Sequence, residues 1–279
     1  MSTPSRPRAT KIICTIGPAT DTSDMLGQLI EAGANVFRLN MSHSKHDWVR
    51  EVVFRIRRKA AELEANVAIL FDLQGPSIRT GDLAEPYHLK KGDTVEIRLG
   101  TAKPELPFST TVNYDGLLQD VQAGHTMVVD NGGILMRIAE VRPDRLICDV
   151  LTEGVFGSRR HINLPGVALR LPALTEKDLA DLAVAVECET DYVAMSFVRD
   201  AAHIAQLREH IDNLGGKAQI VAKIEDQQAV RHIDDIILAA DVIMVARGDL
   251  GIEVSIEELP IIQRRIIRHC HRLGRRCIV

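Results

Sequence analysis

Residues 11–39 read KIICTIGPATDTSDMLGQLIEAGANVFRL and contain a complete strand–helix–strand unit. The runs 11–16 and 35–39 are short, apolar and bounded by glycine, proline or charge, as expected of buried strands. Between them, Thr22 precedes apolar residues at helical spacing, and Gly33 marks where that helix ends. A helix between two such strands predicts a βαβ unit, whose two strands lie parallel in one sheet.

The same alternation continues along the chain. A second helix is predicted from about residue 46 to 64, and a third strand at 67–71. Thr175-Glu-Lys-Asp178 has the spacing of a capping box, and Ser255-Ile-Glu-Glu258 predicts the start of another helix. We expect this last helix to turn four isoleucines inward: Ile261, Ile262, Ile266 and Ile267. Further strands are predicted at 192–195, 220–222 and 242–246, with the start of a seventh at 277–279.

Residues 82–171 differ in pattern from the rest of the chain. Alternating apolar and polar stretches are separated by Gly, Pro, Asp and Asn, without a long helical period, which predicts a small all-β domain inserted after the third strand. The remaining residues are fewer than the about 250 typical of a closed (β/α)8 barrel. The predicted fold class is therefore α/β, an incomplete TIM (β/α)8 barrel of about six and a half βα units. The predicted domains are 1–81, the first part of the barrel domain, 82–171, the inserted β-barrel lid domain, and 172–279, the second part of the barrel domain, ending at strand seven.

Composition and charge argue against several classes of protein. The chain has 279 residues, 46% of them hydrophobic and 26% charged, as in soluble globular proteins. Its net charge of −4 gives no basic field, so neither nucleic acid nor a membrane is expected as a partner. The five cysteines have no metal-binding or disulfide spacing, and residues 1–8 lack the apolar core of a signal peptide. These features favour a cytoplasmic location.

Six polar clusters stand at strand ends or at the close of the insertion, where barrel enzymes carry their chemistry. They are Arg38-Leu-Asn40-Met-Ser42-His43, Asp72-Leu-Gln-Gly-Pro-Ser-Ile-Arg79, Arg159-Arg160, Ser196, Lys223-Ile-Glu225 and Arg247-Gly-Asp249. Any one of them could be a structural cap, and a lone Lys-x-Glu is usually a surface ion pair. Their joint occurrence favours a functional site.

The chemistry of these clusters points to anions and metal ions. No glycine loop of the GxxxxGK[ST] or GxGxxG type is present, so phosphate chemistry would rest on cations and basic side chains. Glu225 and Asp249 are hard oxygen ligands on neighbouring strands and suit Mg²⁺. Lys223 and the nearby arginines suit an anionic substrate whose charge moves during group transfer.

Several longer motifs resemble those of the pyruvate kinase family. They are Thr10-Lys-Ile-Ile-Cys-Thr-Ile-Gly-Pro-Ala19, Phe37-Arg-Leu-Asn-Met-Ser-His43, Phe71-Asp-Leu-Gln-Gly-Pro76, Ile162-Asn-Leu-Pro-Gly166, Leu171-Pro-Ala-Leu-Thr-Glu-Lys177, Ala222-Lys-Ile-Glu225 and Met244-Val-Ala-Arg-Gly-Asp-Leu-Gly-Ile252. They follow one another in the family's order. The resemblance implies a (β/α)8 barrel with a β-domain after the third strand. It also implies glycolytic phosphoryl transfer from phosphoenolpyruvate to ADP, giving pyruvate and ATP.

The resemblance implies a role for each residue at a matching position. Lys223 would polarise the bridging oxygen of phosphoenolpyruvate and stabilise the enolate. Other substrate contacts would come from Arg38, at the transferring phosphate, and from the backbone amides of Gly248 and Asp249. Glu225 and Asp249 would hold Mg²⁺ or Mn²⁺. K⁺ would be held by Asn40, Ser42, Asp72 and the Leu73 carbonyl. The nucleotide would meet Asn40, His43, Arg79 and Arg160.

Three departures from the family pattern accompany this resemblance. Ser77 stands where the family usually has Glu or Lys, a position tied to whether K⁺ is required, so K⁺ dependence stays open. His161 replaces a usual glycine beside Arg160, at the hinge of the lid. At Val279 the family continues with an Ala-Thr-Gln-Met-Leu-Glu segment. We therefore expect a C-terminally shortened chain with impaired activity.

Two alternatives stay open at this point. The first is a non-catalytic pyruvate kinase remnant that binds only a ligand or a partner; the intact set of charged residues from Arg38 to Asp249 argues against it. The second is a phosphoenolpyruvate-linked aldolase on a similar barrel, which would need neither the β-insertion nor the set of Arg38, Arg79 and Lys223. Full-length members of the family are usually homotetramers, and the assembly of this chain is left open.

Overall fold

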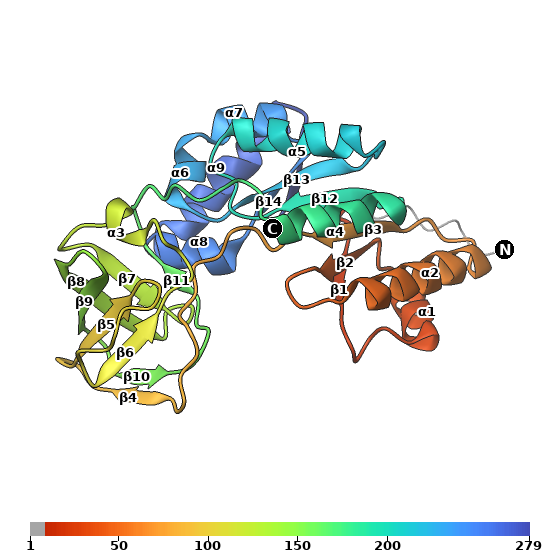
Figure 1. Cartoon of the computed structure of the whole chain (residues 1–279). Helices are drawn as coiled ribbons and strands as arrows, with labels where there is room; N and C mark the ends of the chain where they lie inside the picture. Colours follow the sequence, from red (N-terminus) through yellow and green to blue (C-terminus); the bar gives the residue numbers. More distant parts are fainter. Residues whose placement is uncertain (1–8) are drawn as a thin grey trace.

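The computed structural model describes residues 9–279, and its largest sheet has seven strands (Figure 1). In sheet order, which is also chain order, they are β1 (Ile13–Ile16), β2 (Val36–Asn40), β3 (Ala68–Asp72), β12 (Tyr192–Met195), β13 (Gln219–Ile224), β14 (Val242–Val245) and β15 (Arg276–Ile278). Every neighbouring pair is parallel. The sheet curls like half of a barrel, so the predicted α/β class is confirmed.

Helices connect the strands, and apolar side chains of these helices pack with one face of the sheet in a large core. The helices are α1 (Ser23–Glu31), α2 (His46–Glu62), α4 (Glu176–Glu187), α5 (Ala201–Asn213), α6 (Gln227–Arg231), α7 (Ile233–Ala239), α8 (Arg247–Glu253) and α9 (Leu259–Arg272). Two predicted helix starts are confirmed. The Thr22 side chain accepts a hydrogen bond from the Met25 amide, and Thr175 and Asp178 form a reciprocal capping box. No helix in the described part of the chain has the length and hydropathy that a membrane span requires. The prediction that residues 1–8 are no signal peptide lies outside the described residues.

The helix predicted to start at Ser255 starts instead at Leu259, with Glu258 as its N-cap. Pro260 fits the first turn, because a helix leaves its first amide groups without an intrahelical partner and proline has no N–H to lose. Ile266 is buried as predicted, but Ile261 is 69% exposed. The prediction that all four isoleucines face inward was therefore wrong. Successive residues of a helix point about 100° apart, so two adjacent isoleucines cannot both face the centre of one apolar stripe.

The chain between β3 and α4, residues 73–175, which we call the β-segment, forms two further sheets to one side of the seven-stranded sheet (Figure 1). One sheet has the order β11-β7-β8-β9-β5-β6, and the other pairs β10 with β4. The strands are β4 (Tyr87–Leu89), β5 (Thr94–Arg98), β6 (Phe108–Thr111), β7 (Thr126–Val129), β8 (Ile134–Val141), β9 (Arg145–Val150), β10 (Gly154–Phe156) and β11 (Ile162–Asn163). A short helix, α3 (Leu117–Asp120), interrupts the otherwise β pattern. The apolar side chains of this segment form a core cluster of their own.

Side chains alternate between the two faces of the sheet along β13, and this alternation determines which of them point to the inner face of the curled sheet. Ile220 and Ala222 pack in the large core between the sheet and the helices. Val221 points to the opposite face and packs there with Leu70, Ala194 and Val242. Lys223 and Glu225 follow Val221 at alternate positions, so the strand delivers both of these charged side chains to the inner face at its carboxyl end.

Candidate active site

A cavity of about 480 Å³ lies at the carboxyl ends of the parallel strands, against the turns of the β-segment. Eleven of the twelve predicted site residues line it: Arg38, Asn40, Ser42, His43, Asp72, Leu73, Arg79, Arg160, Lys223, Glu225 and Asp249. The twelfth, Gly248, lies in the first turn of α8 and is not among the lining residues. The structure therefore brings together residues that are up to 211 positions apart in the sequence.

The ammonium group of Lys223 contacts three side chains of the cavity. Its Nζ lies 2.8 Å from Glu225 Oε1 and 3.3 Å from Asp72 Oδ1, and it donates a hydrogen bond of 2.7 Å to Ser196 Oγ. The side chain is nearly buried. Although burial opposes its charge, the carboxylates of Glu225 and Asp72 raise the pKa of Lys223 above its usual value. Lys223 is therefore an ammonium ion at neutral pH, fixed by three oxygen atoms.

Asp72 links this lysine to Arg38. Nε and Nη2 of Arg38 lie 2.7 Å and 2.6 Å from Asp72 Oδ2, and Nη1 donates to Thr15 Oγ1 over 2.9 Å. Asp72 is almost fully buried, whereas the Arg38 side chain keeps 27% of its surface exposed. Strands β2, β3 and β13 thus place one cation at each oxygen of the buried Asp72 carboxylate: Arg38 at Oδ2 and Lys223 at Oδ1. Such an arrangement holds positive charge in place before an anionic group arrives.

The carboxylates of the cavity fit a hard divalent cation in their chemistry. Among residues 9–279 no group of three or more His, Cys, Asp and Glu side chains converges as a metal cluster. Mg²⁺, however, usually takes one or two carboxylates and completes its shell with water and substrate oxygens. Glu225 follows β13 and Asp249 lies in the first turn of α8, and burial and the charge of Asp249 both act to raise the pKa of Glu225. These two acids are therefore close enough to interact.

Both oxygens of Glu225 already have partners. Oε1 lies against Lys223, and Oε2 accepts a hydrogen bond of 2.6 Å from the amide of Phe197. A bound cation would therefore share these atoms rather than occupy free ones. The buried Asp72 Oδ1 has no hydrogen-bond partner and is a further oxygen that faces positive charge.

Arginines of the β-segment also line the cavity. Arg79 donates to the Arg159 carbonyl over 3.0 Å and to Ser77 Oγ over 3.3 Å. Arg160 pairs with Asp130 over 3.2 Å, and its Nε is buried without a partner. Neither guanidinium has all of its donors occupied by these contacts, so both can still bind an anion in the cavity.

A glycine fixes how the chain leaves β3. Gly75 has φ of 70°, and a Cβ added there would lie 2.9 Å from Ser196 Cβ and 3.1 Å from Phe197 Cδ2. Its amide donates to Asp178 Oδ1 over 3.0 Å, which ties the turn to the start of α4. This close approach holds the turn after β3 against the end of β12, and Leu73 accepts a 2.7 Å hydrogen bond from Ser196 there.

The sequence interpretation missed three residues that line the cavity: Asp130, Asn131 and Phe197. Asp130 and Asn131 precede two glycines and have φ of 57° and 52°, so their turn was foreseeable from the sequence. The sequence does not indicate that this turn approaches the strands of another sheet. Phe197 is apolar and has φ of 54°, and nothing in the local sequence indicates a position beside a polar cavity.

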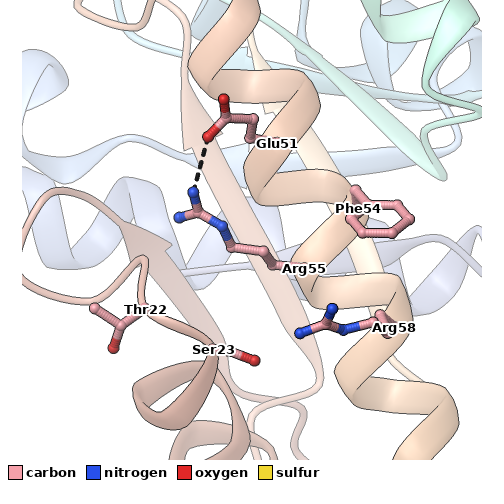
Figure 2. Close-up of a pocket in the computed structure, with 6 residues that line it drawn as sticks. All are labelled: Thr22, Ser23, Glu51, Phe54, Arg55 and Arg58. Carbon is pink, nitrogen blue, oxygen red and sulfur yellow. Dashed lines mark hydrogen bonds and ion pairs between the residues drawn. The ribbon is translucent and has the colours of Figure 1, made fainter.

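A second hollow lies between α1 and α2 and is lined by the six residues labelled in Figure 2: Thr22, Ser23, Glu51, Phe54, Arg55 and Arg58. Arg55 points toward Glu51, with 2.8 Å between Nη2 and Oε2, and it also donates to the Asp21 carbonyl. The hollow thus contains a carboxylate that is already paired and none of the predicted site residues. The cavity around Lys223 is therefore the candidate active site.

Comparison with known proteins gives a consistent result. Residues 7–279 match the family model described as pyruvate kinase, barrel domain. The chain is 40% identical over 281 aligned residues to plastidial pyruvate kinase 2 of Arabidopsis thaliana. This alignment covers 100% of this chain and 48% of the relative. Identity to a pyruvate kinase of Clostridium perfringens is 39%, over 95% of this chain and 56% of the relative. Identity to a pyruvate kinase of Staphylococcus aureus is 36%, over 96% of this chain and 46% of the relative. The chain spans about half the length of these relatives.

Proposed function

The chain belongs to the pyruvate kinase family, and on that premise we propose that its cavity transfers a phosphoryl group from phosphoenolpyruvate to ADP. The observation that carries the proposal is the buried ammonium of Lys223, fixed by Glu225, Asp72 and Ser196 at the carboxyl end of β13. A preorganised charge at this position stabilises negative charge that develops on a substrate oxygen. Catalytic residues of barrel enzymes lie at this end of the strands.

In this proposal Lys223 acts at the leaving oxygen. When the bond from phosphorus to the bridging oxygen breaks, the electron pair remains on that oxygen, which becomes an enolate oxygen. Nζ of Lys223 supplies positive charge there, and its contacts to Glu225 and Ser196 keep it in place without reorganisation. The enolate then takes a proton at its methylene carbon and becomes pyruvate. The transferred group adds to the terminal phosphate of ADP and gives ATP.

The arginines divide the phosphate contacts between them. Arg38 lies beside Asp72 on the sheet side and would bind the transferring phosphate. Arg79 and Arg160 lie on the side of the β-segment and would bind the nucleotide phosphates. Asn40 ends β2 and His43 follows it; both line the cavity and would meet the nucleotide. Gly248, at the start of α8, would contribute its backbone amide to the substrate carboxylate, together with that of Asp249.

Two cation sites complete the proposal. Glu225 and Asp249 would hold Mg²⁺ or Mn²⁺, which neutralises charge on the phosphates when bound. Asn40, Ser42, Asp72 and the Leu73 carbonyl would hold K⁺. The first two of these residues already contact each other: Asn40 Oδ1 accepts a hydrogen bond of 3.1 Å from the backbone amide of Ser42. Ser77 lies in the same cavity and has an uncharged side chain. Comparing turnover with and without K⁺ tests whether the protein depends on K⁺.

The same premise extends to fold and assembly. We propose that the seven parallel strands belong to a (β/α)8 barrel domain, made of residues 1–81 and 172–279, and that residues 82–171 form its lid domain. The family resemblance implies a homotetramer for full-length members, and the cysteine pattern supports the cytoplasmic location that we propose. Two of the plant relatives are named plastidial and chloroplastic, so the location needs its own test.

An assay of pyruvate formation coupled to lactate dehydrogenase tests the function. With phosphoenolpyruvate, ADP and Mg²⁺, the protein should turn over, and Glu225→Gln should lose both turnover and affinity for Mn²⁺ measured by water-proton relaxation. Glu257→Gln changes an exposed glutamate near α9 and serves as the control. Phosphoenolpyruvate binding without turnover would favour the ligand-binding remnant. Unchanged Mn²⁺ affinity in Glu225→Gln would refute the metal assignment.

A further inference from the structure

His161 lines the cavity and connects the β-segment to Phe197, just after the end of β12. Its ring centroid lies 5.9 Å from that of Phe197, with the two planes tilted by 57°. This is a favourable edge-to-face distance and tilt for aromatic rings. The other ring contacts among residues 9–279 pair Tyr87 with Phe108 and with Phe156, within the β-segment. The contact of His161 is thus the ring contact that crosses between the two parts of the described chain.

Each ring is attached to a part of the candidate active site. On one side, His161 pairs with Arg79 in a short antiparallel bridge and directly follows Arg160. On the other side, the amide of Phe197 donates to Glu225 Oε2 over 2.6 Å. The rings therefore connect the arginines of the β-segment to the carboxylate that holds Lys223.

The Phe197 ring stands on a fixed base. Its residue has φ of 54°, in the left-handed region that a bulky side chain rarely adopts, and Gly75 packs close beneath it. Such a conformation persists where surrounding contacts over-determine it. The His161 limb, by contrast, is held by backbone bonds at the edge of the segment, from Ile162 to Ile78 and from Asp130 to His161. The ring contact therefore adds a side-chain contact to Phe197 to the backbone bonds that hold this limb.

We propose that His161 is a positioning residue, whose ring packs on Phe197 and holds the limb 159–163 against the large sheet, so that Arg79 and Arg160 face Lys223 and Glu225. The proposal rests on the proposed function for its catalytic consequence, although the contact itself does not. The imidazole acts by packing and does not touch the substrate.

The charge state of the ring agrees with a packing role. Burial and the neighbouring Arg79 lower the pKa of His161 below its usual value, against the opposing effect of Asp249. The ring is therefore neutral at pH 7, and it adds no positive charge to the phosphate contacts of the arginines.

Three variants separate packing from polar contact. His161→Gly removes the ring, His161→Phe keeps a ring without nitrogen, and His161→Gln keeps a polar group without a ring. An edge-to-face contact shifts an equilibrium by about two- to tenfold. His161→Gly should raise the KM for ADP by that factor and change kcat less, and His161→Phe should restore the KM whereas His161→Gln should not. Restoration by Gln and not by Phe would show that His161 binds the substrate, and would overturn the proposal.

Hydrogen exchange decides the proposal without any turnover. The amides of Thr80 and Ile162 donate to backbone carbonyls of the limb and its neighbour, and the amide of Arg160 donates to the Thr80 hydroxyl; the exchange of these three amides, measured by mass spectrometry, should quicken about two- to tenfold in His161→Gly. His88→Gly removes an exposed histidine from β4 and should leave these amides unchanged. If exchange quickens but no variant turns over, the positioning contact stands and the proposed function fails. If exchange at these amides is unchanged in His161→Gly, the positioning role is wrong whatever the assay gives.

Discussion

Glu253 is the last residue of α8, and its carboxyl group is partly buried among polar groups. Burial raises its pKa to about 7, and the charge of Asp226 adds to this, whereas the amide of Gly166 and the side chain of Asn163 act in the opposite direction. Burial also raises the pKa of Asp226. Ionised Glu253 is therefore costly in the folded protein.

Glu253→Gln removes the titration and keeps the shape of the side chain. The pKa of Glu253 is about 7 in the folded chain, against an ordinary value of 4.5. Glu253 thus contributes stability that is fully present below about pH 4.5 and is lost as the pH rises through 7. One pKa unit corresponds to about 1.4 kcal/mol, so the wild type should lose on the order of 3 kcal/mol from this residue by pH 8. The variant keeps a neutral amide and should be the more stable protein at pH 8 by a similar amount.

Urea unfolding at several pH values between 5 and 8 measures this difference. Circular dichroism follows the whole chain, and the fluorescence of Trp48, in α2, follows the large sheet and its helices. Glu257→Gln is the matched control, because Glu257 is exposed and its loss should leave the pH dependence unchanged. Equal pH slopes in the wild type and Glu253→Gln would show that the folded protein tolerates the ionised carboxylate, and the reasoning from burial would be wrong.

Buried contacts elsewhere give three shorter predictions. Gly75→Ala should lower the free energy of unfolding by about 1–3 kcal/mol, because of its positive φ and the approach of Ser196; an unchanged urea midpoint would contradict this. Asp178→Ala should cost about 2–3 kcal/mol, since its carboxylate accepts from the amides of Gly75 and Thr175, and amide exchange in α4 should quicken; protected amides would count against the capping role. Cys148, whose pKa burial raises to about 12, should resist thiol reagents at pH 8 until urea unfolds the β-segment; rapid labelling of the native protein would show that this cluster opens.

Strands of the large sheet could be predicted because local pattern and burial agree there. The run 192–195 corresponds to β12 (Tyr192–Met195), with three of its four residues buried. The short helices α6 and α8 could not be predicted in the same way, since one or two turns give too little periodicity. The misplaced start of α9 has a different cause. Ser255 has the chemistry of an N-cap, but Pro260 favours the first turn and moved the start to Leu259.

Much of the candidate site was predictable because polar side chains that directly follow parallel strands meet at one edge of the sheet. Asp72 ends β3 and Glu225 follows β13, and the cavity contains both. Contacts from the β-segment depend on how two sheets pack, which no local pattern encodes. Phe197 illustrates this, because its backbone amide, and not its side-chain type, connects it to Glu225.

The central claim is that Lys223 acts on the chemistry of phosphoryl transfer and not on binding. Single-turnover transfer followed by ³¹P NMR, with phosphoenolpyruvate affinity measured on the same sample, tests it in Lys223→Met. Lys217→Met, at an exposed lysine just before β13, is the control. Loss of a preorganised charge should slow transfer by about 10²–10³ while affinity stays within a few-fold. Transfer at the wild-type rate in Lys223→Met, or a loss of affinity large enough to explain the slower rate, would contradict the claim.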